Sequence, residues 1–318
     1  MASRPAGTPE LAAAYEQCRR IHAAHGRTYY LATRLLPRDR RPDVWALYAF
    51  ARVSDELVDG PDVQPVNPTA LLMWREQAMA AMRSTSSPNP VEQPVLAATW
   101  HTMRTFGLEA GLIQEFLDSM VMDLTVSRYA TWEELRGYMR GSAAVIGELM
   151  APLLGAHGPD ALFRAGALGE AFQLTNFIRD VSEDYSLNRI YLPQADLARF
   201  DVSEDMLADA VRTSTPSPQV RSLVAFEVRR AVSLYAVAGP GLRMVDARSR
   251  PCLEAAYTLY KRILHGVIAN DFNVFQRRIT VPTGQRLATV GHVATRTAIS
   301  GVTATTRSWC RSTPRPRS

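Results

Sequence analysis

Apolar residues recur at helical spacing along most of this chain. Segment after segment places them three and four residues apart, and no stretch alternates apolar and polar residues with period two for long enough to indicate a sheet. Proline and glycine separate these segments, most clearly at 61–68, 84–94, 155–159 and 213–218. The pattern predicts helices over residues 10–24, 42–59, 68–83, 91–106, 110–126, 132–154, 160–184, 218–237 and 250–275.

The connections between these segments are short, as they are within one compact domain. A chain of 318 residues that is 47% hydrophobic can bury one large core. We therefore expect an all-α, single-domain helical bundle over residues 10–285. We expect a disordered N-terminus over 1–9 and a basic, partly disordered tail over 286–318.

Several classes of protein are disfavoured by composition. No apolar run reaches the roughly 18–20 residues that span a bilayer, and the N-terminus lacks the basic-then-apolar pattern of a secretory signal. The three cysteines, Cys18, Cys252 and Cys310, lie far apart, which argues against a zinc site or a disulfide framework and fits a reducing cytoplasm.

The positive charge of the chain is concentrated near its C-terminus. The formal net charge is +5, and six arginines with no acidic residue follow Gln285. The preceding body is therefore close to neutral, which is poor evidence for a nucleic-acid surface, and we expect no nucleic-acid partner. The basic tail is compatible with weak attraction to anionic lipid, worth about 1 kcal/mol per charge near the surface. We expect a cytoplasmic protein that can contact the inner face of the membrane peripherally.

The helix predicted over 42–59 is apolar on nearly every side, which indicates a buried helix. One line along it is polar, with spacings of four, three and four residues that place its members on one face. This line consists of Tyr48, Arg52, Asp55 and Asp59. Two buried carboxylates one turn apart repel each other, so a cation should face them.

A second apolar helix carries a similar stripe. Gln173, Asn176, Asp180 and Asp184 recur at three, seven and eleven residues from the first of them. If the two helices face each other, four carboxylates and one amide oxygen converge. Hard oxygen ligands without His or Cys suit Mg²⁺.

Arginines accompany both stripes. Arg52 and Arg179 precede aspartates, Arg189 follows the second stripe, and Arg277 and Arg278 come later in the chain. Guanidinium groups match phosphate oxygens in a bidentate manner. Together the residues indicate an apolar cavity with a Mg²⁺–diphosphate mouth, which suits ionising an allylic diphosphate away from water.

Four blocks of this sequence resemble the squalene/phytoene synthase family, the head-to-head prenyl synthases, over roughly residues 15–285. HGRTYYLATRLLP (25–37) is similar to the family's N-terminal flap, and ALYAFARVSDELVD (46–59) to its first aspartate-rich motif. YMRGSAAVIGELM (138–150) resembles the first signature, with small residues that keep the pocket wall thin. LGEAFQLTNFIRDVSEDYSLNRIYLP (168–193) resembles the second signature almost position by position.

The resemblance implies roles for matched positions. The metal ligands of a cluster of about three Mg²⁺ ions, with Mn²⁺ as a substitute, would be Asp55, Asp59, Asn176, Asp180 and Asp184. Arg52, Arg189 and Arg277 would grip diphosphate, and Thr28 and Tyr29 would help to close the site of the first step. We also expect Gln173, Asn176 and Arg179 to bind substrate. Tyr48, Tyr138 and Tyr260 would line the region where cations form. Two departures are Gly26, where some relatives carry a hydroxyl, and the segment beyond Pro282, which has no match.

The resemblance also implies a two-step reaction. Two isoprenyl diphosphates would condense to a cyclopropyl diphosphate, which ionises, rearranges and loses a proton to give a conjugated triene such as phytoene. The motifs look most like those of bacterial phytoene synthases, for which no NADPH is expected. Two alternatives stay open: a C15-using relative that makes squalene, dehydrosqualene or presqualene diphosphate, and a non-catalytic assembly factor, which the intact carboxylates and arginines disfavour.

Overall fold

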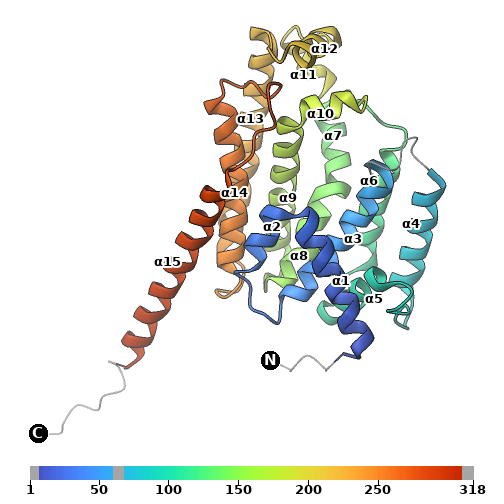
Figure 1. Cartoon of the computed structure of the whole chain (residues 1–318), viewed down its shortest axis with the longest axis vertical. Coiled ribbons are helices and arrows are strands. Elements are labelled where there is room, and N and C mark those ends of the chain that lie inside the picture. The colour runs from blue at the N-terminus through green and yellow to red at the C-terminus, as the bar shows by residue number, and fades with distance from the viewer. Residues whose placement is uncertain (1–6, 60–67, 310–318) are drawn as a thin grey trace, which may run out of the picture.

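The structure, a computed structural model, describes residues 7–59 and 68–309, with side chains over the same ranges except at Arg27, Asp59 and 297–309. It is an all-helical single domain (Figure 1). The helices are α1 (Pro9–His25), α2 (Arg27–Thr33), α3 (Arg41–Asp59), α4 (Pro68–Arg83), α5 (Pro94–Phe106), α6 (Ala110–Met122), α7 (Trp132–Met139), α8 (Val145–Leu153), α9 (Pro159–Arg179), α10 (Val181–Ser186), α11 (Gln194–Arg199), α12 (Glu204–Thr213), α13 (Pro218–Ala238), α14 (Arg250–Ala269) and α15 (Thr283–Trp309).

The predicted helices exist, but several of their limits are wrong. Helix α5 begins at Pro94 rather than at residue 91, and α6 ends at Met122 rather than at residue 126. The segment 132–154 is divided by a π-helical turn over Arg140–Ala144. The segment 160–184 breaks at Asp180, whose backbone leaves the helical region (φ −102°, ψ 12°). The segment 250–275 ends at Ala269 because Asp271 and Phe272 adopt positive φ angles of 52° and 56°.

Four helices were not predicted. Three of them, α2, α11 and α12, have only 6 to 10 residues, too few for a clear apolar period. The fourth, α15, covers most of the segment that we expected to be a basic tail. Its Thr289 and Val293 are buried, and Arg296 pairs with Glu254 of α14. The domain boundary at residue 285 stays a prediction.

The N-terminal helix begins where its capping residue allows. Thr8 accepts a hydrogen bond from the Leu11 N–H at 3.3 Å, and proline occupies the first helical position. The expectation of disorder over 1–9 concerns mainly residues 1–6, which lie outside the described part of the chain.

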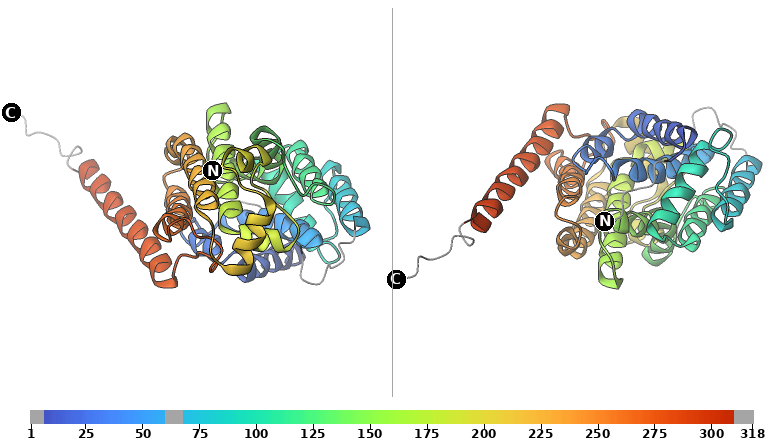
Figure 2. Two further views of the ribbon diagram at one scale, coloured as in Figure 1. Left: turned by 90° about the horizontal axis from the view of Figure 1, so that it is seen from above. Right: turned by 90° about the horizontal axis from the view of Figure 1, so that it is seen from below.

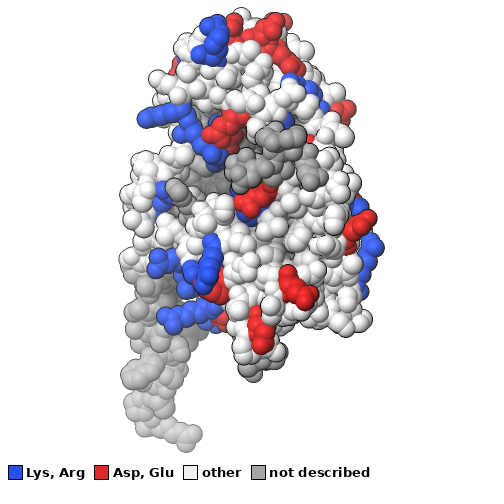
Figure 3. All heavy atoms as spheres, turned by 45° about the vertical axis from the view of Figure 1, so that its right-hand side comes forward, with Lys and Arg blue, Asp and Glu red and all other residues white. Residues whose placement is uncertain are grey.

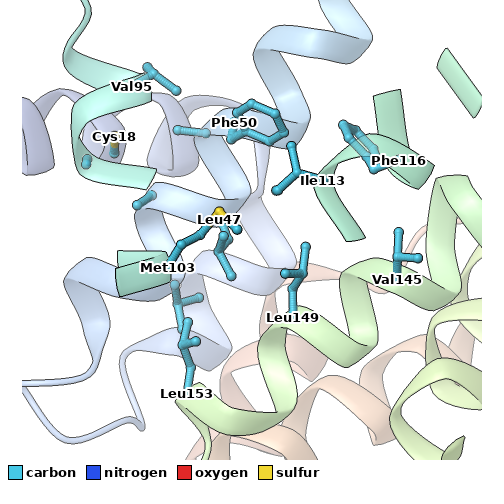
Figure 4. Close-up of a cluster of buried hydrophobic side chains, with 14 of the residues drawn as sticks. Cys18, Leu47, Phe50, Val95, Met103, Ile113, Phe116, Val145, Leu149 and Leu153 are labelled. Carbon is cyan, nitrogen blue, oxygen red and sulfur yellow. The ribbon is translucent and has the colours of Figure 1, made fainter. Parts of the chain in front are cut away.

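Two apolar clusters flank the interior of the bundle. One unites α1, α3, α4, α5, α6 and α8, and Figure 4 shows Leu47, Phe50 and Leu149 within it. The other is built around α9, α13 and α14. Helix α9 lies between them, packed against α8 on one side and α13 on the other. In the views from above and below, α15 runs outward from the body beyond α14 (Figure 2).

Glycines bring α8 and α9 unusually close. A Cβ at Gly147 would overlap the backbone carbonyl of Ala165, and a Cβ at Gly169 would overlap that of Ala143. Because both obstacles are backbone atoms, neither can rotate away. The expectation that small residues thin this wall agrees with the observed packing. Among the described helices, none combines the length and the hydrophobicity that crossing a membrane requires.

Candidate active site

A cavity of about 410 Å³ lies between the two apolar clusters. Its lining comes from α1, α2, α3, α6, α7, α8, α9, α13 and α14, together with the turns beside α8 and α13. Along α9 the lining extends from Ala161 to Asn176, which corresponds to about 22 Å of helix. Most of these residues are apolar, so the interior can hold a long hydrocarbon chain and exclude water.

Polar residues of the cavity gather at one end, which we call the mouth. Arg52 and Asp55 reach it from α3, while Gln173 and Asn176 reach it from α9. The structure therefore brings part of the first predicted stripe to the same cavity as part of the second. Figure 3 shows acidic and basic side chains side by side on the upper half of one face of the molecule.

The arginine of the first stripe is paired within its own helix. Arg52 Nη1 lies 2.9 Å from Asp55 Oδ2, and its Nε lies 2.9 Å from Glu56 Oε1. His25 Nδ1 is 3.4 Å from the same Glu56 oxygen. The Asp55 side chain is 47% exposed, so it is accessible from solvent as well as from the cavity. The side chain of Asp59, the other carboxylate predicted here, lies outside the described residues.

The carboxylate of Asp180 is neutralised by two guanidinium groups. Arg179 donates to both oxygens, with Nε 2.7 Å from Oδ1, and Arg278 Nη2 lies 2.9 Å from Oδ2. Arg278 also contacts Glu183 at 3.2 Å. The side chains of Arg179 and Asp180 are both only 13% exposed. A partly buried carboxylate with two cations is a site where metal ions and diphosphate oxygens can exchange partners.

Asn176 carries an unsatisfied oxygen at the mouth. Its Oδ1 is buried and has no hydrogen-bond partner among the described atoms. Leaving a buried acceptor unpaired costs about 1–3 kcal/mol, so a ligand is expected to fill this position. An amide oxygen beside carboxylates is a hard ligand, and this donor set fits Mg²⁺.

The described residues alone do not form a complete metal cluster. Within the described side chains, no three Asp, Glu, His or Cys residues lie close enough together to hold a metal ion. The convergence of all four predicted carboxylates, and their role as ligands, therefore stays a prediction.

Asp184 and Arg189 lie together, but beside a different cavity. Both line a second, very small cavity with Phe177 and Tyr191. The Arg189 N–H donates to the Asp184 carbonyl at 2.9 Å, and the guanidinium donates to the Asp123 carbonyl at 3.4 Å. Neither residue lines the large cavity. Asp184 nevertheless lies one turn beyond Asp180, since its N–H donates to the Asp180 carbonyl at 2.8 Å.

The remaining predicted binding residues are spread around the mouth end. Tyr29 lines the large cavity from α2. Thr28 is half-buried on the same helix and is absent from the lining, and Arg277 is exposed. The structure pairs its neighbour Arg278, rather than Arg277, with the acidic residues.

The predicted tyrosines differ in position. Tyr48 and Tyr138 line the cavity, whereas Tyr260 lies behind it, stacked on Tyr29 with centroids 4.8 Å apart. The Tyr138 hydroxyl donates to Asp123 Oδ2 at 2.8 Å. Burial raises the pKa of Tyr138 well above its ordinary value and raises the pKa of Tyr48 to about 12. All these hydroxyls are therefore neutral at physiological pH.

Three residues of the site had no signal in the sequence. His22 of α1 and Phe172 of α9 line the cavity, and Asp123 accepts the Tyr138 hydrogen bond. His22 and Asp123 lie outside the acidic motifs and the matched blocks. Phe172 looked like one apolar residue among many in its helix. Only the packing of the helices brings these side chains to the site.

Known proteins resemble this chain in sequence and in fold. The squalene/phytoene synthase family matches residues 22–285 of the chain. The chain belongs to this family. Members are Mg²⁺-dependent prenyltransferases acting on isoprenyl diphosphates, and this chain is a phytoene synthase-like, head-to-head prenyltransferase.

Similar proteins include two 15-cis-phytoene synthases. The chain is 37% identical over 286 residues to a 15-cis-phytoene synthase of Synechocystis sp., covering 86% of this chain and 82% of the relative. It is 33% identical over 292 residues to a 15-cis-phytoene synthase of Synechococcus elongatus, covering 88% and 92%.

Solved structures share the fold. A dehydrosqualene synthase in complex with ligand superposes with a TM-score of 0.81 at 27% identity, covering 90% of this chain and 97% of that chain. A squalene synthase, HpnC from Alicyclobacillus acidocaldarius, superposes with a TM-score of 0.72 at 27% identity, covering 83% and 96%.

Proposed function

We propose that this chain is a 15-cis-phytoene synthase of carotenoid biosynthesis. It would join two geranylgeranyl diphosphates head to head through a cyclopropyl diphosphate. Two observations support the C20 substrate. The relatives described above are 15-cis-phytoene synthases, and the apolar part of the cavity follows α9 from Ala161 to Phe172, about 17 Å, below the polar mouth.

The length of the cavity is the observation that carries the proposal. An extended C20 prenyl chain is roughly 19 Å long and a C15 chain roughly 14 Å, from carbon–carbon bonds of about 1.5 Å. The far end is lined by small residues such as Ala161, Ala165 and Gly241, which leave that depth open. The apolar part of the lining, about 17 Å long, exceeds a C15 chain, which would leave its far end without contacts, whereas a C20 chain reaches that end.

The residues of the mouth bind and orient the diphosphates. Asp55, Asn176 and Asp180, with Asp59 and Asp184, would hold Mg²⁺, which stabilises the diphosphate as it leaves. Arg52, Arg179 and Arg278 pair with carboxylates in the protein alone. With substrate and Mg²⁺ bound, the metal would neutralise the carboxylates. These guanidinium groups would then be free to bind diphosphate oxygens.

The walls below the mouth protect the carbocations. Tyr48 and Phe172 present aromatic rings to the cavity, and the faces of such rings attract cations. The raised pKa of Tyr48 keeps its hydroxyl protonated, so it cannot trap the cation as a phenolate. The apolar lining excludes water, which would otherwise quench the cation.

A substrate-choice assay tests this proposal. The purified enzyme with Mg²⁺ is offered C15 or C20 diphosphate, each with and without NADPH, and the hydrocarbons are identified. We expect phytoene from the C20 substrate without NADPH. Squalene or dehydrosqualene from the C15 substrate, with little product from C20, would assign the chain to the C15-using branch of the family instead.

A further inference from the structure

The large cavity ends in a thin wall at the pole opposite the mouth. Ala161, Arg164, Gly241, Leu242 and Val245 line this end. Arg164 and Leu242 are also partly exposed, and the Arg164 side chain is 24% exposed. At these positions a single layer of side chains separates the cavity from the surface. We call this pole, formed by residues 34–41, 153–164 and 237–250, the basal face.

The wall is held by polar contacts around Arg164. Its Nη1 donates to the Val237 carbonyl at 2.8 Å, and its Nε lies 3.1 Å from Asp160. The 3₁₀ turn that contains Gly241 rests directly on this side chain, since a Cβ at Gly241 would lie 2.8 Å from Arg164 Cβ. Partly exposed ion pairs of this kind contribute little stability, so the wall can open at low cost.

Large apolar side chains are exposed around the same arginine. Phe163 is 58% exposed, Val237 39% and Met244 38%. Phe163 precedes Arg164 on α9, Val237 supplies the carbonyl that Arg164 binds, and the Met244 N–H donates to the Gly241 carbonyl at 3.0 Å. Exposed apolar groups that gather at one place indicate an interaction surface.

The basal face is also strongly basic. Its three segments contain eight arginines and three aspartates. Arg40 links them, donating to the Leu153 carbonyl at 3.3 Å and approaching Asp246 to 4.0 Å. Arg38, Arg243 and Arg248 are exposed, and none of them forms an ion pair with a described residue. Exposed apolar side chains and exposed arginines on one face match a bilayer interface that carries anionic lipid.

We propose that the basal face docks onto an anionic membrane surface and that the hydrocarbon product leaves the cavity there. This inference rests on the proposed function, because only a product without a diphosphate needs such a route. The mouth is lined with guanidinium and carboxylate groups and opens to water, which disfavours passage of a long hydrocarbon. The thin wall at Arg164 and Leu242 instead opens towards lipid.

Vesicle binding tests the docking step without any chemistry. Wild type is cosedimented with vesicles of phosphatidylcholine alone or mixed with phosphatidylglycerol. Phe163→Glu and Met244→Glu should each weaken binding to the anionic vesicles by at least about tenfold. Met73→Glu is the matched control, because Met73 of α4 is 55% exposed but lies far from the basal face. Arg243→Gln with Arg248→Gln should remove the preference for anionic lipid.

Three results would overturn the docking proposal. The first is equal binding by wild type and the Phe163→Glu variant. The second is self-association of the wild type in sedimentation velocity that Phe163→Glu abolishes, which would assign the face to a second copy of the chain. The third is an equal loss of binding in Met73→Glu.

Turnover measurements test the release step. Anionic vesicles should raise the steady-state rate of wild type and leave its single-turnover rate unchanged, whereas Phe163→Glu should keep the single-turnover rate and lose the stimulation. Equal stimulation of both proteins refutes release through the basal face while the proposed function stands. If C20 diphosphate gives no hydrocarbon although vesicle binding depends on Phe163, the proposed function and the release route fail and the docking surface remains.

Discussion

The His22 ring lies flat against the Tyr48 ring, with centroids 4.0 Å apart and planes inclined by 17°. Gly26 makes room for the pair, because a Cβ there would lie 2.6 Å from His22 Cδ2 and 2.8 Å from Tyr48 Cζ. Both nitrogens of His22 are buried without a hydrogen-bond partner among the described atoms. Burial lowers the pKa of His22 to about 3. A neutral imidazole thus supports the face of a tyrosine that lines the cavity.

This stack predicts a pH-dependent stability. The folded-state pKa of His22 is below its ordinary value near 6.5, so the unfolded chain binds a proton first, and stability is lost as pH falls from about 6.5 towards 3. His22→Phe keeps the stack and removes this loss, which at pH 5 amounts to about 2 kcal/mol. We expect the melting temperature of the variant to exceed that of wild type by more at pH 5 than at pH 7.5. The same difference in melting temperature between variant and wild type at both pH values would contradict this prediction.

The carboxylates of the mouth predict a loss of turnover without a loss of fold. Asp55→Asn and Asp180→Asn should each lower kcat by at least about 10²-fold, a typical effect of removing one electrostatic stabiliser. Asp118→Asn is the matched control, because Asp118 is 48% exposed and also pairs with an arginine, Arg75, but neither lines the cavity like Asp55 nor pairs with Arg179 and Arg278 like Asp180. Circular dichroism checks the fold. Near wild-type turnover of either mouth variant at saturating Mg²⁺ would show that the site is misassigned.

Site residues that share one face of a single regular helix could be predicted from the sequence. The first stripe reaches the mouth as expected because Tyr48, Arg52 and Asp55 share a face of one uninterrupted helix, α3. The second stripe assumed the same regularity, but the chain leaves the helical region at Asp180, and Asp184, one turn later, lines a second, very small cavity. A single deviating residue of this kind has no clear apolar or polar signature.

Residues that meet through tertiary packing were beyond prediction. His22 comes from α1 and belongs to no motif, and only the approach of α1 to α3 places it on Tyr48. The long helices were foreseen because an apolar face repeated over many residues has few alternatives. Short helices such as α2 and α11 depend on their neighbours for stability.

Arg277 and Arg278 are expected to have different roles in the reaction. Arg277 is exposed, whereas Arg278 pairs with Asp180 and Glu183. We expect Arg277→Ala to shift the product from hydrocarbon towards the cyclopropyl diphosphate, since the resemblance to the family places it with the diphosphate of the second step. Arg278→Ala should lower total turnover instead, because it removes a partner of Asp180. Quantifying both products by chromatography checks this. Equal loss of both species in Arg277→Ala would indicate a general binding or folding defect.

Glu227 should make the stability depend on pH with a sign opposite to that of His22. It is fully buried on α13, where Arg230 Nη1 lies 2.8 Å from its oxygens and 2.7 Å from Asp196. Burial raises its pKa to about 7, so the folded chain holds a proton that the unfolded chain has released above about pH 4.5. Stability is therefore lost as pH rises from about 4.5 through 7.

Glu227→Gln removes this penalty and should stabilise the protein by up to about 3 kcal/mol at pH 8 and much less at pH 4.5. Urea unfolding at the two pH values measures the difference. Asp209→Asn, which changes an exposed pair with Arg212, serves as the control and should have a small effect at both. A stabilisation by Glu227→Gln that is the same at both pH values would mean that the carboxyl titrates normally.

The glycines between α8 and α9 predict a steric effect on both stability and activity. Gly147 lines the cavity, and an added Cβ would overlap the Ala165 carbonyl, which cannot move unless the two helices separate. Gly147→Ala should therefore destabilise the fold by about 1–3 kcal/mol and lower turnover, because the wall beside the substrate shifts. Gly137→Ala on α7 is the matched control, since nothing lies within 4 Å of its added Cβ, and it should stabilise the protein by up to about 1 kcal/mol. Thermal unfolding and steady-state rates of the two variants decide the matter. Equal melting temperatures would show that α8 and α9 can separate freely, against the close packing observed.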